Sequence, residues 1–426
     1  MKLSVKENSK NYVCTVVEID KLFPIENADK IQRCVINGND VIVSKDVKIG
    51  DKMLYFVSGT RLNVDFCKFN NLLTDKEQNK DITKTGYISH KQFRVKAIKL
   101  KGVISDGILL PIESLSFNES IKYKYLMVGD EFTDIDNISL CEKYFVPSRN
   151  SNPGGKAPKK LGARIQDIII ENQFKFHTDT EHFVKNLNKF TQESEIIITR
   201  KIHGSSLILA NVLINKKLSV KERIFNFFGA NIPKSEYGIV WSSGKPKSKL
   251  PKGVESNTNK WETPNPSYYT SDIWAKAYKE IGNKIEKGIS IYAEIVGKGI
   301  QGDLFTYNQD YGIYIYRITQ TSIDGNTVEF SWEQVKKYCK KYDLNYVQEY
   351  FVGKVKELTI LEEDRDLLFY LQNMYLNKSY SDCKIDEGIC IRLRESDEIF
   401  KLKSPNFIKM ESDLQEQEVE NIEDSQ

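Results

Sequence analysis

The residues best able to do chemistry surround one lysine. Lys201 follows a β-branched run at 196–199 and precedes a turn rich in small residues at 203–206, after which a second strand-like run covers 207–212. This order predicts a lysine at the edge of a sheet, above a pocket in which a glycine admits a ligand close to the backbone and serine hydroxyls meet phosphate or ribose. Such a lysine can act as a covalent nucleophile when neighbouring groups keep its amine partly deprotonated.

Five further residues with suitable chemistry follow at or near the ends of predicted strands: Glu294, Tyr316, Glu387, Lys401 and Lys403. Taken singly, each is typical of a surface charge or, for the tyrosine, of core packing. The two lysines are two positions apart and therefore share one face of a strand. With the first lysine, the set provides a nucleophile, two more cations, two carboxylates and an aromatic ring. Transfer of a nucleotidyl group from a nucleoside triphosphate requires such a set.

The chain ahead of these residues reads as a small β-structure. Strand-like runs lie at 13–19, 32–36, 40–43 and 52–57. They are separated by turn residues, and Asn37-Gly38 is a hairpin signal. We expect residues 1–145 to form an OB-fold-like β-barrel. Residues 90–101 alternate basic and apolar side chains, which fits either an ordinary half-buried strand or a face that contacts RNA or phosphate.

Composition divides the rest of the chain. Residues 146–160 are dense in Pro, Gly, Ser and Lys and predict a linker. Residues 161–410 mix both periodicities, so we expect an α+β domain. Its predicted strands are 289–296, 312–318, 388–393 and 399–403, and its predicted helices are 180–190, 271–285, a helix after the capping box of Ser331 and Gln334, and 364–376. The stretch 245–270 predicts a mobile surface loop, and the acidic residues 411–426 predict a disordered tail.

The overall composition limits the classes of function. The 426 residues contain 62 Lys and Arg against 59 Asp and Glu, a balance that neither requires nor excludes a nucleic-acid partner. No apolar run is as long as a membrane span and no signal-peptide core is present, so we expect no membrane association and a cytoplasmic, intracellular location. Seven scattered cysteines and four dispersed histidines disfavour a zinc site or a disulfide framework. A metal ion would be a hard cation held by carboxylates, phosphates and water.

The ordered segments carry a family resemblance. Lys-x-His-Gly-Ser-Ser, Tyr-Ala-Glu-Ile-Val-Gly, Tyr-Arg-Ile, Glu-Gly-Ile-Cys-Ile-Arg and Lys-Leu-Lys-Ser resemble motifs I, III, IIIa, IV and V of the covalent nucleotidyltransferases. His203 in the place of aspartate, with Gly-Ile-Gln at 299–301, resembles the RNA ligases of the T-even-phage nick-sealing and kinetoplastid editing type. A barrel ahead of motif I resembles the Deinococcus and Naegleria-type RNA ligases, as do residues 26–31, 47–51 and 174–180. The resemblance covers most of the chain.

The resemblance implies an ATP-dependent RNA ligase whose nucleotidyltransferase domain consists of antiparallel sheets flanked by helices. Lys201 would carry AMP covalently, while Lys401 and Lys403 would offset the charge that develops on the α-phosphate. Glu387 would orient the water of a catalytic Mg²⁺ or Mn²⁺ ion, and Glu294 would meet a ribose hydroxyl or the water around the metal.

The remaining implied roles concern the nucleotide and the substrate. Tyr316 would stack on adenine, and the pocket would be lined by His203, Gly204 and Ser205. The implied substrate is RNA with 3′-hydroxyl and 5′-phosphate ends, at nicks in duplexes with RNA on the 3′-hydroxyl side. The enzyme would act as a monomer.

The sequence departs from the family pattern at one place, and two alternative functions remain open. The family often has an arginine in motif Ia, but residues 240–245 contain none, and Lys245 lacks the two-pronged donor geometry of arginine. The same chemistry could serve another substrate, as in a DNA ligase, a capping enzyme that uses GTP or an enzyme that acts on RNA 3′-phosphate ends. A non-catalytic RNA-binding protein of the OB type is the other alternative. It is disfavoured because such a protein should have lost some of the charged residues that the chemistry needs.

Overall fold

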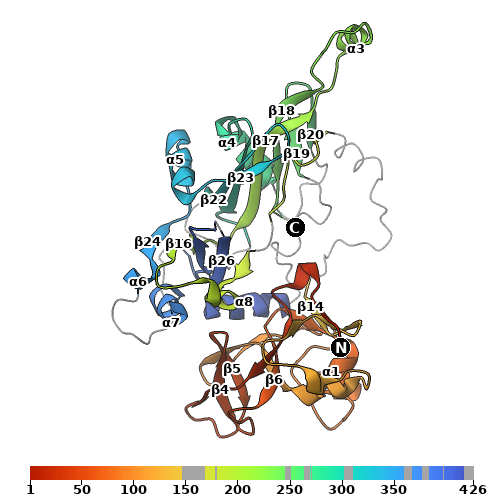
Figure 1. Ribbon diagram of the computed structural model, residues 1–426, viewed down its shortest axis with the longest axis vertical. Helices are drawn as coiled ribbons and strands as arrows, with labels where there is room; N and C mark the ends of the chain where they lie inside the picture. The colour runs from red at the N-terminus through yellow and green to blue at the C-terminus, as the bar shows by residue number, and fades with distance from the viewer. Residues whose placement is uncertain are drawn as a thin grey trace.

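The computed structural model describes residues 1–145, 168–177, 180–244, 251–262, 269, 271–301, 310–358, 367–376, 383–396 and 398–416. The predicted linker at 146–160 and Lys245 lie outside these residues. Figure 1 shows the N-terminal part at one end, the larger sheets above it and helix α8 (Pro405–Glu416) between the two. Among the described helices, none is long and apolar enough to cross a membrane.

The N-terminal part is built from short antiparallel strands around a buried core. One sheet has the order β10 (Ile108–Pro111), β6 (Lys52–Phe56), β2 (Cys14–Glu18) and β11 (Glu131–Phe132). The others are β3 (Leu22–Pro24), β4 (Ile31–Ile36) and β5 (Asn39–Ser44); β1 (Leu3–Ser4), β12 (Asp134–Ile135) and β13 (Ile138–Ser139); β14 (Cys141–Lys143) with β7 (Thr60–Leu62); and β8 (Ala97–Leu100) with β9 (Val103–Asp106). Helix α1 (Val64–Phe69) contributes Phe66, which is fully buried against Phe56.

Two predictions for this part have different outcomes. The hairpin at Asn37-Gly38 is confirmed, since both residues have positive φ (48° and 73°) and join β4 to β5. The single strand predicted for 90–101 is wrong. Phe93 has a φ of 54°, which breaks the extended backbone, and only β8 of that stretch is a strand. Arg94 is 1% exposed and therefore does not belong to a solvated cationic face.

Two antiparallel sheets form the second part. The five-stranded sheet has the order β15 (Glu181–His182), β26 (Glu398–Lys403), β25 (Gly388–Leu393), β16 (Glu195–Lys201) and β24 (Glu349–Lys354), and its β15–β26 pair is parallel. The seven-stranded sheet has the order β20 (Lys260–Glu262), β19 (Gly253–Glu255), β18 (Ser235–Ser242), β17 (Ser205–Asn215), β21 (Ile289–Val296), β22 (Gly312–Thr321) and β23 (Thr327–Glu329).

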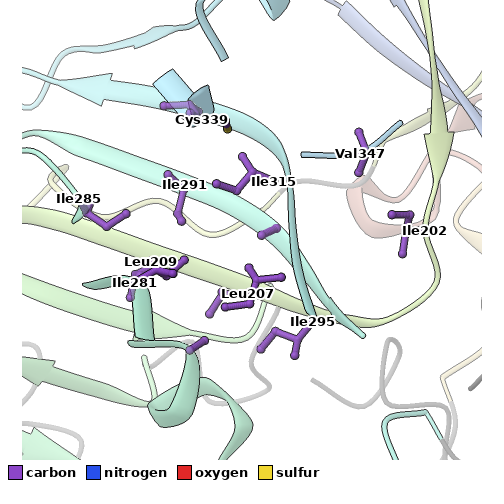
Figure 2. Packing of buried hydrophobic residues seen from close by; sticks show 14 of the residues in the cluster. Ile202, Leu207, Leu209, Ile281, Ile285, Ile291, Ile295, Ile315, Cys339 and Val347 are labelled. Carbon is purple, nitrogen blue, oxygen red and sulfur yellow. The ribbon is translucent and has the colours of Figure 1, made fainter. Parts of the chain in front are cut away.

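The largest core lies between the seven-stranded sheet and two helices. Helices α4 (Ile273–Ile281) and α5 (Trp332–Tyr342) bury Trp274 and Trp332 against it. Figure 2 shows β17 and β21 side chains meeting residues from both helices in this core, with Ile202 near its edge. A second core beneath the five-stranded sheet includes residues of α6 (Val355–Leu358) and α7 (Leu367–Leu371).

The predicted elements of this part are mostly confirmed, with four corrections. Every predicted strand is present, as are α4 and α5. The helix predicted for 180–190 is wrong, because the chain forms β15 and two 3₁₀ turns there. The loop predicted for 245–270 contains the β19–β20 hairpin. The helix predicted for 364–376 consists, where described, of α7 and a π-helical turn, and the predicted tail overlaps α8 as far as Glu416.

Candidate active site

The nucleophile candidate lies where the two large sheets meet. Lys201 is the last residue of β16 and pairs with Gly388 of β25. The next strand, β17, begins at Ser205 in the other sheet, so the intervening turn carries the chain between sheets. Gly204 packs so tightly that a Cβ there would lie 2.5 Å from the carbonyl oxygen of Ile295. Glycine is therefore required at position 204, in the turn that follows the lysine.

A fully buried carboxylate, that of Glu387, brings the charged groups together. Its Oε1 lies 2.7 Å from Nζ of Lys201 and 3.7 Å from Nζ of Lys403. Its Oε2 lies 3.7 Å from Nδ1 of His203. A Cβ on Gly388 would lie 2.2 Å from the carbonyl oxygen of Leu402, so the glycine lets β25 and β26 approach closely at this point.

The environment keeps this carboxylate ionised. Burial by itself would raise the pKa of Glu387, because desolvation penalises the charged form. The charge of Lys201, the ring of His203 and the charge of Lys403 outweigh burial and hold the pKa of Glu387 well below its usual range. A permanent negative charge therefore lies beneath the lysines.

The motif V lysines line the same cavity as Lys201. Lys401 and Lys403 both come from β26, and Nζ of Lys403 also lies 3.1 Å from the carboxylate of Glu411 on α8. Phe407 of α8 packs its ring 5.0 Å from the ring of His203. Helix α8 thus forms one wall of the cavity and supplies a carboxylate to it.

The cavity is also lined by Glu294 of β21 and Tyr316 of β22. Glu294 pairs in register with Ser206 of β17. Burial first, and then the charge of Glu294, raises the pKa of Tyr316, so its phenol remains protonated. The Tyr316 ring lies edge-on to His177 with centroids 5.7 Å apart.

The three predicted lining residues, His203, Gly204 and Ser205, are not among the residues that line the cavity. The side chain of Ser205 is fully buried, and Ser206 lines the cavity in its place. His203 is 2% exposed and sits between Glu387 and Phe407, where it supports the carboxylate. Ser206 faces the cavity and Ser205 does not, because adjacent residues of β17 point to opposite faces of the sheet.

Sequence reasoning missed several supporting residues. Gln301 donates a 2.6 Å hydrogen bond from Nε2 to the carbonyl oxygen of Gly204, which fixes the turn after the nucleophile. Arg200 and Asp386, the residues directly before Lys201 and Glu387, form a buried ion pair of 2.8 Å. The Gly-Ile-Gln sequence at 299–301 could have indicated Gln301. No sequence pattern indicates the pair of Arg200 and Asp386, which are 186 residues apart.

The N-terminal part contributes to the cavity as well. Tyr12, Arg94 and Lys143 line it together with the residues of the second part. Arg94 donates a 2.8 Å hydrogen bond to the carbonyl oxygen of Ser412 on α8, and its other terminal nitrogen lies 3.2 Å from the hydroxyl of the same residue. Arg94 is thus the residue of the 90–101 stretch that lines the cavity, and its hydrogen bonds join the OB-fold domain to α8.

Comparison with known proteins agrees with this arrangement. Residues 194–403 match a family model described as RNA ligase, and residues 13–112 match a model described as an OB-fold domain. No curated protein matches the chain.

Solved structures of variants of the Naegleria gruberi RNA ligase are similar over nearly the whole chain. A ligand-free variant has 17% identity and a TM-score of 0.57, over 94% of this chain and 98% of that chain. One variant bound to AMP and manganese and another bound to ATP and manganese each have 16% identity, over 93% of this chain and 98% of theirs, with TM-scores of 0.56 and 0.57. This likeness confirms the expected α+β fold, with an OB-fold barrel before the nucleotidyltransferase domain.

The RNA ligase match contains both large sheets except β15, and with them Lys201, Glu294, Glu387 and the motif V lysines. Residues 194–403 therefore form a domain of the RNA ligase family, and an OB-fold domain precedes it in the chain.

Proposed function

We propose that this enzyme is an ATP-dependent RNA ligase that seals 3′-hydroxyl and 5′-phosphate ends through AMP bound covalently to Lys201. The observation that carries the proposal is the convergence of three lysines, Lys201, Lys401 and Lys403, on one cavity that also contains Glu294 and Tyr316. The similar fold of a ligase solved with ATP and manganese supports ATP as the nucleotide.

In the first step, Nζ of Lys201 attacks the α-phosphorus of ATP. A nitrogen–phosphorus bond forms, the bond to the bridging oxygen breaks, and pyrophosphate leaves with the electron pair. The attacking amine must lose its proton, and nearby positive charge favours the neutral form. Lys401 and Lys403 supply that charge and also stabilise the negative charge that develops on the phosphate.

A divalent ion, Mg²⁺ or Mn²⁺, fits the donors that are present. Among the described residues no cluster of three or more His, Cys, Asp or Glu side chains could hold a metal. An ion would therefore be bound mostly by phosphate oxygens and water, which hard cations accept. Glu387 would hold the ion through water, with Glu294 as a second water-mediated contact. When bound, the ion adds positive charge at the reacting phosphate.

The nucleoside end of the cavity would bind adenosine. Tyr316 is neutral and half-buried, and its ring offers a stacking surface for adenine. Glu294 accepts from a ribose hydroxyl. The AMP then passes to an RNA 5′-phosphate, and the 3′-hydroxyl of the second strand attacks that phosphate and expels AMP.

We further infer that the substrate is a nicked duplex with RNA on the 3′-hydroxyl side, and that the enzyme acts as a monomer inside the cell. All seven cysteines lie within the described residues and none forms a disulfide, which suits a reducing compartment. The cavity is built from one chain, including its OB-fold domain, so no second subunit is needed to complete it.

The proposal is tested by incubating the protein with Mg²⁺ and α-labelled ATP or GTP and then denaturing it. Label from ATP should stay on the wild-type chain and on Lys260→Ala, which alters a lysine that is 66% exposed, but not on Lys201→Ala. Label from GTP alone would assign a capping activity, and label from neither nucleotide would overturn the proposal. Sealing of nicks that carry RNA or DNA on each side then defines the strand preference.

A further inference from the structure

The hairpin of β17 and β18 ends in a helix that is exposed along its whole length. Helix α3 (Val220–Phe227) joins the two strands, and none of its residues is buried. Figure 1 shows α3 at the far end of the molecule from the OB-fold domain. The helix begins with a capping box in which Ser219 and Glu222 exchange hydrogen bonds. The local sequence therefore stabilises the helix without tertiary packing.

This tip, residues 216–234, presents aromatic rings to solvent. Phe225 is 58% exposed, Phe227 is 86% exposed and Phe228 is 78% exposed. The rings of Phe227 and Phe228 lie edge to face with centroids 5.6 Å apart. Val220 and Ile224 are also more than half exposed. Clustered exposed apolar side chains are typical of binding surfaces.

The charges around the rings are almost all positive. Lys217, Lys221, Arg223 and Lys234 are exposed. The only acidic residue between positions 216 and 234 is Glu222, which is paired with Lys216 at 2.5 Å. Aromatic rings among exposed basic side chains match the requirements of single-stranded nucleic acid, whose bases stack on the rings while its phosphates bind the cations.

We propose that the tip binds an unpaired segment of the RNA substrate by stacking bases on Phe227 and Phe228. This inference rests on the proposed function, because the RNA must lead from the active site to the tip. Strand β17 runs from Ser205 beside the nucleophile to Asn215 below the tip, and its 11 residues span roughly 36 Å. Stacked nucleotides advance about 3.4 Å each, so the tip meets RNA about ten nucleotides from the junction.

The test measures binding of a dye-labelled, 24-nucleotide single-stranded RNA by fluorescence anisotropy. Three double variants at Phe227 and Phe228 are compared, with alanine, leucine or tryptophan at both positions. Leucine keeps the apolar surface but removes the stacking ring, and tryptophan keeps the ring. Phe369→Ala is the matched control, since this aromatic residue on α7 is 51% exposed.

The alanine and leucine variants should lose at least about 25-fold in affinity, which is about fivefold for each lost stack. The tryptophan variant and the control should stay within about twofold of wild type. Sealing should weaken only for substrates whose unpaired RNA reaches more than about ten nucleotides away from the junction.

Two outcomes overturn the proposal. RNA affinity that is unchanged in both the alanine and leucine variants excludes RNA binding at the tip. A loss in the alanine variant that leucine restores would show an apolar contact without stacking, and loss of binding to phosphatidylserine vesicles would then assign the tip to a membrane surface. Labelling of Lys201 by ATP is measured in parallel, so failure of the proposed function is distinguished from failure at the tip.

Discussion

The arrangement of single residues in the site depends on one negative charge. Oε1 of Glu387 lies within 4 Å of the ammonium groups of both Lys201 and Lys403, which would repel each other without it. The carboxylate is fully buried, so its attraction to the lysines is weakly screened by water. It therefore holds the ammonium groups of both lysines close together beside the cavity.

Glu387→Gln should lower the free energy of unfolding at pH 7 by about 3 kcal/mol and abolish labelling of Lys201, because it removes the buried negative charge that Lys201 and Lys403 share. The folded-state pKa of Glu387 is depressed. Its stabilisation is therefore present above the unfolded pKa of about 4.3 and is lost as the pH falls further. Urea unfolding between pH 7 and pH 3 measures both effects.

The exposed Glu113 provides the control for this experiment. Glu113→Gln should change neither the stability nor its pH dependence. The acid-induced loss of stability should be smaller in Glu387→Gln than in wild type, because the variant no longer has the ion pair to lose. Identical pH profiles for wild type and Glu387→Gln would contradict the assigned role.

The sequence pointed to charged residues that the structure brings together, but not to the residues that support them. Lys201, Glu294 and Glu387 stand at strand ends next to glycine-containing turns, a local pattern that the sequence shows directly. Contacts such as Arg200 with Asp386 depend on which strands become neighbours, and β16 and β25 are far apart in the chain. The sequence could not show that Ser206 rather than Ser205 lines the cavity, because the face of a strand is set by its partner sheet.

Among the helices and strands, the predictions succeeded where local signals and packing agree. Helix α5 begins at the predicted capping box and buries Trp332. The helix expected at 180–190 fails because Phe183 and Phe190 contact each other at 4.9 Å across two 3₁₀ turns, with Phe190 also against Phe400. The helix-like spacing of these phenylalanines therefore belongs to two 3₁₀ turns, which bring the rings together as a helix would.

The two capping boxes give a matched pair of substitutions. Ser331→Ala removes the cap of α5, whose packed face belongs to the main core, and should lower the free energy of unfolding by about 1 kcal/mol. Ser219→Ala removes the cap of α3, which has no buried residue and can unfold locally. Its global unfolding midpoint in urea should match wild type. Equal losses in both variants would mean that α3 is part of the cooperative fold.

Helix α8 places a second carboxylate at the cavity. Glu411 lies 3.1 Å from Nζ of Lys403, where it opposes the entry of an anionic triphosphate and occupies a lysine that phosphate would use. Glu411→Gln should therefore lower the dissociation constant of ATP by about threefold to tenfold, an effect of about 1 kcal/mol. Isothermal titration calorimetry with Lys201→Ala, which binds ATP without reacting, measures this. Weaker binding in Glu411→Gln would instead show that Glu411 orients the lysine.

For the molecule as a whole, α8 links the two domains beside the cavity. It follows β26 directly, packs Phe407 on His203 and receives hydrogen bonds from the OB-fold domain at Ser412. The donors are the guanidinium of Arg94 and the backbone nitrogen of Ala97. Sequence analysis placed the two domains correctly in order but could not predict this contact, which joins residues more than 300 positions apart.

The chain itself offers a selective probe of this link. All four tryptophans lie between positions 241 and 332, so tryptophan fluorescence reports the unfolding of the ligase domain alone. Arg94→Met keeps most of the side-chain volume but removes the buried hydrogen bonds to Ser412, which are worth about 2 kcal/mol when the donor is charged. If the OB-fold domain stabilises the ligase domain through α8, this substitution shifts the tryptophan transition to lower urea.

Arg33→Met removes an arginine whose 2.7 Å ion pair with Asp40 stays within the OB-fold domain, so it should leave that transition in place. A tryptophan transition that is unchanged in Arg94→Met would show that the domains unfold independently and that α8 is held by the ligase domain alone.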